Sequence, residues 1–207
     1  MAAASDDELF EAWRAGDKQA GTELFRRHYD VLARFFSNKV GAEHRLELMQ
    51  RTMLACVEAS DRFEGKSAFS SYLIGIALRQ LYKHYDRQRR QEQRFDFTSV
   101  SVEDLSPSPS QLIAKQDEYH VLLLALRRLP LDYQVILELV YWEGATAASI
   151  SESLDIPLGT AKTRIRRGKQ LLRDQVETVA ASPALMKSTL SDLDGWAKQL
   201  RERQSSP

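Results

Sequence analysis

The chain has 207 residues, and its 29 lysines and arginines balance its 29 aspartates and glutamates, so the formal net charge is zero. Apolar residues make up 43% and charged residues 28% of the chain, which excludes a wholly disordered protein. The single cysteine, Cys56, excludes an internal disulfide, and no apolar run approaches the ~20 residues of a membrane span. Without a signal sequence or a Gly/Pro-rich composition, the chain is expected to be cytoplasmic, helical and long enough for two small domains.

Helical periodicity dominates the N-terminal part of the chain. A first set of apolar side chains recurs three or four positions apart and predicts amphipathic helices: Leu9 and Trp13, then Leu24, Phe25, His28, Tyr29, Leu32 and Phe36, then Leu48, Thr52, Ala55 and Cys56. A further helix is expected from about Ser67 to Arg90. Its inward face carries Phe69, Leu73, Ile76, Ala77 and Leu81, and an exposed stripe carries Tyr72, Arg79, Lys83 and Arg90.

The helical pattern breaks between Phe95 and Gln116, where a Ser/Pro-rich stretch predicts a linker. We therefore expect an all-α protein with a helical module at 1–94, a linker at 95–116, a second helical module at 117–179 and a C-terminal helical extension at 180–207. The extension has an apolar seam that we expect to pack on a module or bind a partner: Leu185, Leu190, Leu193, Trp196, Ala197 and Leu200.

Two basic clusters lie within this neutral chain. Six basic residues lie between Arg79 and Arg94, and six more lie between Thr160 and Arg173 with no acidic residue among them. Clustered charge favours binding to a polyanion through counterion release, although a single charge run is also typical of a solvated helix face.

The second cluster lies in a helix-turn-helix pattern. Residues 147–154 predict a short helix, 155–157 a tight turn, and Gly159 or Thr160 the start of a second helix that ends near Arg173, with Thr160 as a candidate N-cap. One face of the second helix is apolar, and another suits the major groove of DNA because it carries Lys162, Arg166 and Lys169, with Thr163, Arg167 and Gln170 beside them. The alternative is a charged surface helix of a bundle.

Several segments of this region resemble the C-terminal DNA-binding module of bacterial extracytoplasmic-function (ECF) sigma factors: Leu126–Pro130, Gln134–Leu139, Glu143-Gly144, Ile150–Glu152 and Ile156–Ile165. Asp155 stands where the family usually has glycine. Residues 61–73 and Ile76-Ala77 resemble the family's other module, which holds the core polymerase and opens the promoter. The resemblance implies that the first module reads the minus-ten element and the second reads the minus-thirty-five element.

The resemblance also implies three sets of site residues. The upstream-element set is Thr160, Lys162, Thr163, Arg164, Arg166, Arg167 and Lys169. The minus-ten set, in which an aromatic ring beside cations suits unstacked bases, is Arg62, Lys66, Ser67, Tyr72, Arg79, Lys83, Arg87 and Arg90. The core-polymerase set is Glu47, Leu48, Gln50 and Arg51. Phe63 and Phe69 are expected in the core.

One departure from the family concerns the helix that grips the polymerase clamp. Members usually carry Asp-Ala-Glu-Asp-Leu-Val-Gln-Glu, whereas this chain has His44–Arg51, in which Arg45 and Arg51 add positive charge. We therefore predict weak core binding by the unmodified protein. Phosphorylation of Thr52 would restore a charge of about −1.5 to −2; the alternative is that Thr52 is a packing residue.

No metal, cofactor or enzymatic activity is expected. The four histidines are scattered, only one cysteine is present, and neither a phosphate-binding loop nor a nucleophile elbow occurs. The expected partners are core RNA polymerase, through its clamp helices and flap, and promoter DNA, with no membrane; control by a Ser/Thr kinase or by an anti-sigma factor is left open. The alternative functions are a conventional helix-turn-helix regulator that acts without core polymerase and a protein-interaction scaffold that needs no DNA.

Overall fold

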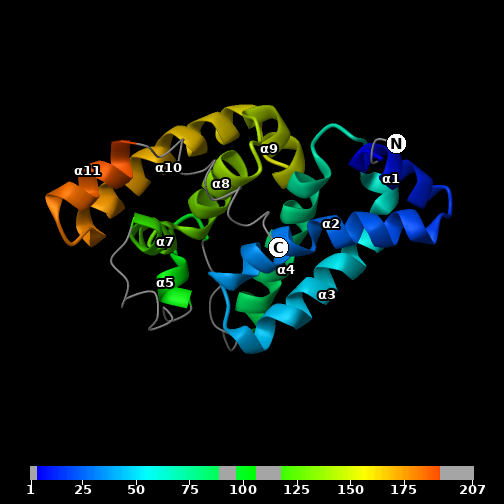
Figure 1. Cartoon of the computed structure of the whole chain (residues 1–207), viewed down its shortest axis with the longest axis horizontal. Helices are drawn as coiled ribbons and strands as arrows, with labels where there is room; N and C mark the ends of the chain where they lie inside the picture. The colour runs from blue at the N-terminus through cyan, green and yellow to red at the C-terminus, as the bar shows by residue number, and fades with distance from the viewer. Residues whose placement is uncertain (1–3, 89–96, 106–117, 192–207) are drawn as a thin grey trace.

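The computed structural model describes residues 4–88, 97–105 and 118–191, and within these ranges the regular structure is helical apart from one isolated bridge between Ser101 and Pro130. The predicted all-α class is confirmed. The elements are α1 (Asp6–Arg14), α2 (Lys18–Ser37), α3 (Ala42–Glu58), the 3-10 turn η1 (Ser60–Arg62), α4 (Phe69–Gln88), α5 (Val102–Leu105), α7 (Glu118–Arg127), α8 (Leu131–Trp142), α9 (Ala147–Leu154), α10 (Leu158–Val179) and α11 (Pro183–Ser191). Figure 1 shows α1–α4 gathered on one side and α7–α11 on the other. None of the described helices is both long and apolar enough to cross a membrane.

Side-chain caps fix the starts of the first two helices. The Ser5 hydroxyl accepts from the Glu8 amide at 3.2 Å, and the Glu8 carboxylate accepts from the Ser5 amide at 2.7 Å, which is a capping box. The Asp17 carboxylate accepts from the amides of Gln19 and Ala20 at 2.8 and 3.2 Å. These bonds satisfy amide groups that a helix start leaves without partners.

The apolar faces of α1–α4 meet in one core. Every predicted inward residue of α4 is buried, and Phe10, Phe63 and Phe69 pack together with ring centroids 4.7 to 5.9 Å apart. The prediction that Phe63 and Phe69 are core residues is confirmed. Tyr29 is different, because it follows the helical pattern of α2 but is 47% exposed.

The described part of the predicted linker, Phe97–Leu105, packs against both modules. Phe97 stacks on Tyr82 of α4 with ring centroids 4.2 Å apart, and its carbonyl accepts from the Asp132 amide at 3.2 Å. The Leu131 amide donates to the Val100 carbonyl at 3.0 Å, and Val102 is fully buried. This segment therefore fixes the start of α8.

A second core lies between α7, α8 and α10, where Val121, Leu126, Leu137, Leu172 and Val176 are buried. From α11, Leu185 and Met186 pack against this core. The expectation that the C-terminal seam packs on a module is thus confirmed for Leu185. The Leu190 side chain and Leu193, Trp196, Ala197 and Leu200 lie outside the described part of the chain.

The two modules share one apolar interior. Buried residues of the second module join the core of α1–α4: Leu131, Val135, Ile136, Leu139, Ile150 and Ala161. Helix α9 lies against α4 (Figure 1), and at Gly75 the backbones are so near that an added Cβ atom would overlap the Ser153 carbonyl oxygen. The sequence predicted two modules but not this contact between them.

Candidate nucleic-acid interface

The helix-turn-helix forms as predicted from α9, a three-residue turn and α10. The Thr146 hydroxyl accepts from the Ser149 amide at 3.1 Å and so caps α9. Asp155 ends α9 with φ 54° and ψ 52°, and it is the sole non-glycine residue with positive φ among those described. This left-handed conformation explains why glycine is usual at that place in the family, and aspartate tolerates it better than most residues.

The second helix begins earlier and ends later than predicted. It spans Leu158–Val179, with Pro157 at the N-cap position and no side-chain cap bond, so the prediction of Thr160 as N-cap is wrong. Proline is suited to this place because it lacks an amide hydrogen that would go unbonded there. The Ser151 hydroxyl instead holds the turn by donating to the Ile156 carbonyl at 2.6 Å.

Four residues of the predicted upstream-element set share the solvent-facing side of α10. Lys162, Thr163, Arg166 and Arg167 are exposed, whereas Ala161, Gly168 and Leu172 are buried on the opposite side. Three long cationic side chains and Thr163 therefore project together from a helix of the length and position that suit a major groove.

The other members of that set are directed elsewhere. The Arg164 guanidinium forms an ion pair with Asp132 of α8 at 2.8 Å, and its side chain is only 23% exposed. The Lys169 ammonium lies 5.3 Å from the centre of the Tyr141 ring, a cation–π distance. Thr160 is half-buried. A direct DNA contact by these three residues stays a prediction, and the geometry of Arg164 counts against it.

The predicted minus-ten set is only partly brought together. Arg79, Lys83 and Arg87 are exposed one turn apart along α4. Tyr72 is half-buried, with its hydroxyl donating to the Ala59 carbonyl at 2.9 Å and its ring 4.7 Å from that of Phe63. Ser67 is half-buried, and Lys66 is exposed and paired with Glu64. The Arg62 side chain and Arg90 lie outside the described part of the structure.

The predicted core-polymerase set lies on α3 and needs one correction. Leu48 is 1% exposed and belongs to the core of the first module, so it is not a surface contact. Gln50 is exposed, and Glu47 pairs with Arg51 at 2.5 Å. The exposed face of α3 carries three large apolar side chains that the sequence analysis missed, at a helical spacing that would have revealed them: Leu46, Leu54 and Val57.

The two arginines of α3 both have hydrogen-bond or ion-pair partners, but only Arg51 is paired with an acid. Arg51 is neutralised by Glu47 one turn away, and the Arg45 guanidinium donates to the Ser37 carbonyl at 3.1 Å, at the end of α2. Glu43 and Glu58 are exposed on the same helix. The outer surface of α3 therefore carries apolar and acidic side chains beside the cationic Arg45, and weak core binding by the unmodified protein stays a prediction.

Thr52, the candidate phosphosite, is fully buried. Its hydroxyl donates to the Leu48 carbonyl at 2.7 Å within α3. Its neighbour one turn on, Cys56, is also buried, and burial raises the pKa of that thiol to about 12. This position matches the packing alternative stated above.

A helix-turn-helix with an exposed basic face, packed on a helical module with a second basic helix, is typical of a DNA-binding protein. Known families match in both modules: "Sigma-70 region 2" over residues 24–91 and "Sigma-70, region 4" over residues 119–172. The chain belongs to the ECF family of alternative RNA polymerase sigma factors, which direct transcription initiation.

Relatives and a solved structure agree over most of the chain. The ECF RNA polymerase sigma-E factor of Haemophilus influenzae is 22% identical over 182 residues, which cover 84% of this chain and 96% of that protein. The protein of the same name from Escherichia coli K12 is 23% identical over 181 residues, covering 84% and 95%. The structure of CnrH in complex with the cytosolic domain of CnrY superposes with a TM-score of 0.60 at 19% identity, covering 84% of this chain and 97% of that one.

Proposed function

We propose that this protein binds core RNA polymerase and directs it to promoters, with α10 reading the upstream element and the first module reading the minus-ten element. The observation that carries the proposal is the exposed basic face of α10, the second helix of the helix-turn-helix. That face presents Lys162, Thr163, Arg166 and Arg167 to solvent. A cytoplasmic location follows from the proposal, because polymerase and promoter DNA are found there.

The outer face of α3 is the proposed contact with the polymerase clamp. Its exposed apolar residues would supply the desolvated centre of the contact, since the fully buried centre of an interface is more apolar than its rim. Glu43, Gln50 and Glu58 would form its polar rim. This set replaces the predicted contact Leu48 with Leu46, Leu54 and Val57.

The controlling partner is the finer part of the proposal. Burial of Thr52 disfavours its phosphorylation by a Ser/Thr kinase, because a kinase needs an accessible hydroxyl. That switch stays a prediction, and it requires α3 to move first. An anti-sigma partner is supported only by analogy. CnrH, which shares the fold of this chain, was solved in complex with the cytosolic domain of CnrY.

Run-off transcription with purified core polymerase tests the proposal. The protein is expected to give a promoter-specific transcript only together with core, and Arg166→Ala is expected to reduce it. Arg26→Ala is the matched control, because Arg26 is a highly exposed arginine of α2 in the other module. A conventional regulator would instead bind duplex promoter DNA alone and give no transcript with core, and a scaffold would show no dependence on DNA.

A further inference from the structure

A cavity of about 120 Å³ lies where side chains of α2, α4, α7 and α8 meet. An apolar cavity of ~150 Å³ is large enough to bind benzene, so this one has room for a ligand of about six non-hydrogen atoms. None of its lining residues belongs to the proposed DNA or polymerase surfaces. Both modules contribute to its apolar lining, which consists of Val31, Phe35, Ile74, Leu123, Leu139 and Trp142.

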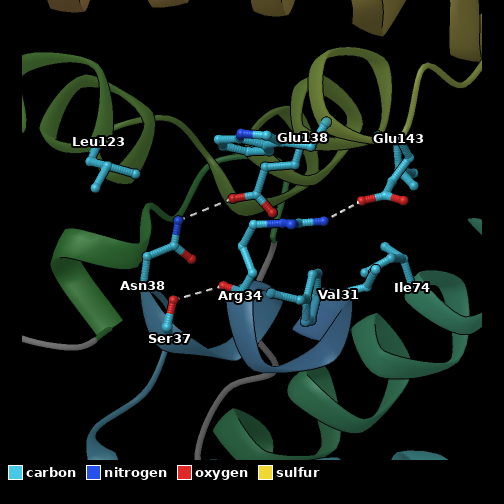
Figure 2. A pocket seen from close by; sticks show the side chains of 11 residues that line it. Val31, Arg34, Ser37, Asn38, Ile74, Leu123, Glu138 and Glu143 are labelled. Atoms are coloured by element: carbon cyan, nitrogen blue, oxygen red, sulfur yellow. Dashed lines mark hydrogen bonds and ion pairs between the residues drawn. The ribbon is translucent and has the colours of Figure 1, made fainter. Parts of the chain in front are cut away.

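The charged side chains that line the cavity are already paired. The Arg34 guanidinium lies 2.6 Å from the Glu143 carboxylate (Figure 2). The Glu138 carboxylate accepts from the Asn38 side chain at 3.2 Å and from the buried Lys39 ammonium at 2.6 Å. A charged ligand would have to break one of these pairs or lose its hydration without gaining a counter-ion, and both cost free energy. The cavity therefore favours a neutral ligand.

One polar group of the lining has no partner. Trp142 is only 8% exposed, and its indole N–H is buried without a hydrogen-bond acceptor among the described residues. It is the one buried side-chain nitrogen or oxygen in this condition among the described lining residues. An indole N–H can only donate, and leaving a buried donor without an acceptor destabilises the folded protein. A ligand with an acceptor atom would satisfy it.

We propose that this cavity binds a small neutral molecule, whose flat apolar body packs between the modules and whose acceptor atom takes a hydrogen bond from the Trp142 indole N–H. The site goes beyond the proposed function and does not depend on it. Its ligand would contact Val31 and Ile74 of the first module and Leu123 of the second. Binding would therefore stabilise the folded chain by mass action.

Pyridine and benzene are the probes for this site, because the two rings have the same size and shape but only pyridine has a hydrogen-bond acceptor. The chain has three tryptophans, so NMR of the isotope-labelled full-length protein resolves few indole N–H resonances, and Trp142→Phe assigns the one in the cavity. At a mildly basic pH, where pyridine is neutral, we expect it to bind with a Kd of about 1 mM and to shift the Trp142 resonance.

Two variants change the cavity in different ways. Trp142→Phe keeps an aromatic ring but removes the donor, so the affinity for pyridine relative to benzene should fall about fivefold. Leu123→Trp fills the cavity and should abolish binding of both probes. Trp13→Phe is the matched control, because it makes the same change in α1 at a tryptophan that does not line the cavity, and both affinities should be unaltered.

Three results would overturn the proposal. A Trp142 resonance that neither probe shifts would show that the cavity takes no such ligand. Equal weakening of both probes by Trp142→Phe would exclude the hydrogen bond and with it the acceptor class. Binding retained in a folded Leu123→Trp protein would place the probes elsewhere. If Leu123→Trp does not fold, the comparison of Trp142→Phe with Trp13→Phe still decides. All of these measurements use the free protein, so polymerase binding is tested separately.

Discussion

Thr52→Glu is the substitution that most directly separates a phosphorylation switch from a packing role. The Thr52 side chain is fully buried in α3, between Leu48 and Cys56, which are themselves buried. A glutamate there would place a carboxylate in the apolar core of the first module with no cation to pair with it. The unpaired charge costs several kcal/mol even after the protein relaxes.

The expected loss is large compared with the stability of a small protein. We expect Thr52→Glu to lower the free energy of unfolding by ~3–5 kcal/mol, against a typical total of about 5–15 kcal/mol. Thr52→Val is the matched control, because it keeps the shape and removes only the hydroxyl that donates to the Leu48 carbonyl. That change should cost no more than about 1 kcal/mol.

Urea unfolding followed by circular dichroism measures both variants, and core-polymerase binding is measured on the same samples. The packing role predicts that Thr52→Glu is destabilised and binds core no better than the wild type. A Thr52→Glu protein as stable as Thr52→Val, with tighter core binding, would refute the burial argument and establish the switch.

Three further predictions concern the other surfaces. Lys162→Ala and Arg166→Ala should each weaken binding at the upstream element by ~1–3 kcal/mol if the contact is to a base; an equal loss on every sequence would instead assign phosphate contacts. Leu54→Ser, at a side chain that is 59% exposed, should leave the free energy of unfolding within ~0.5 kcal/mol of wild type but weaken core binding, and unchanged binding would remove α3 from the interface. Burial and the adjacent His44 ring lower the pKa of His84, so the unfolded chain binds more protons than the folded chain. The free energy of unfolding should therefore fall as the pH drops below 6.5. His84→Gln should flatten this fall, and an unaltered slope would exclude His84 as its source.

Local periodicity predicted the helices and most of their faces correctly. The inward face of α4, the buried Ala161 and Leu172 and the exposed Lys162 and Arg166 all follow from residue spacing along a helix. The predicted minus-ten stripe was less accurate, because Tyr72 turns partly inward to bond the Ala59 carbonyl. A single sequence does not specify which side of an amphipathic boundary an aromatic ring takes.

Contacts between distant segments were outside the reach of the sequence. Arg164 finds Asp132 in another helix, and Lys39 finds Glu138 in another module. The one available signal was the presence of Asp132 and Glu138 in the otherwise apolar helix at 131–142, since a buried carboxylate usually has a cationic partner. That signal predicts a partner but not its identity.

The two arginines of α3 show how local pairing changes a functional argument. Counting Arg45 and Arg51 as free charges led to the prediction that the unmodified protein binds core weakly and needs a phosphate. Arg51 is paired with Glu47, so its charge is offset locally, whereas Arg45 donates to the neutral Ser37 carbonyl and keeps its charge. The electrostatic argument for weak core binding therefore depends on Arg45 alone.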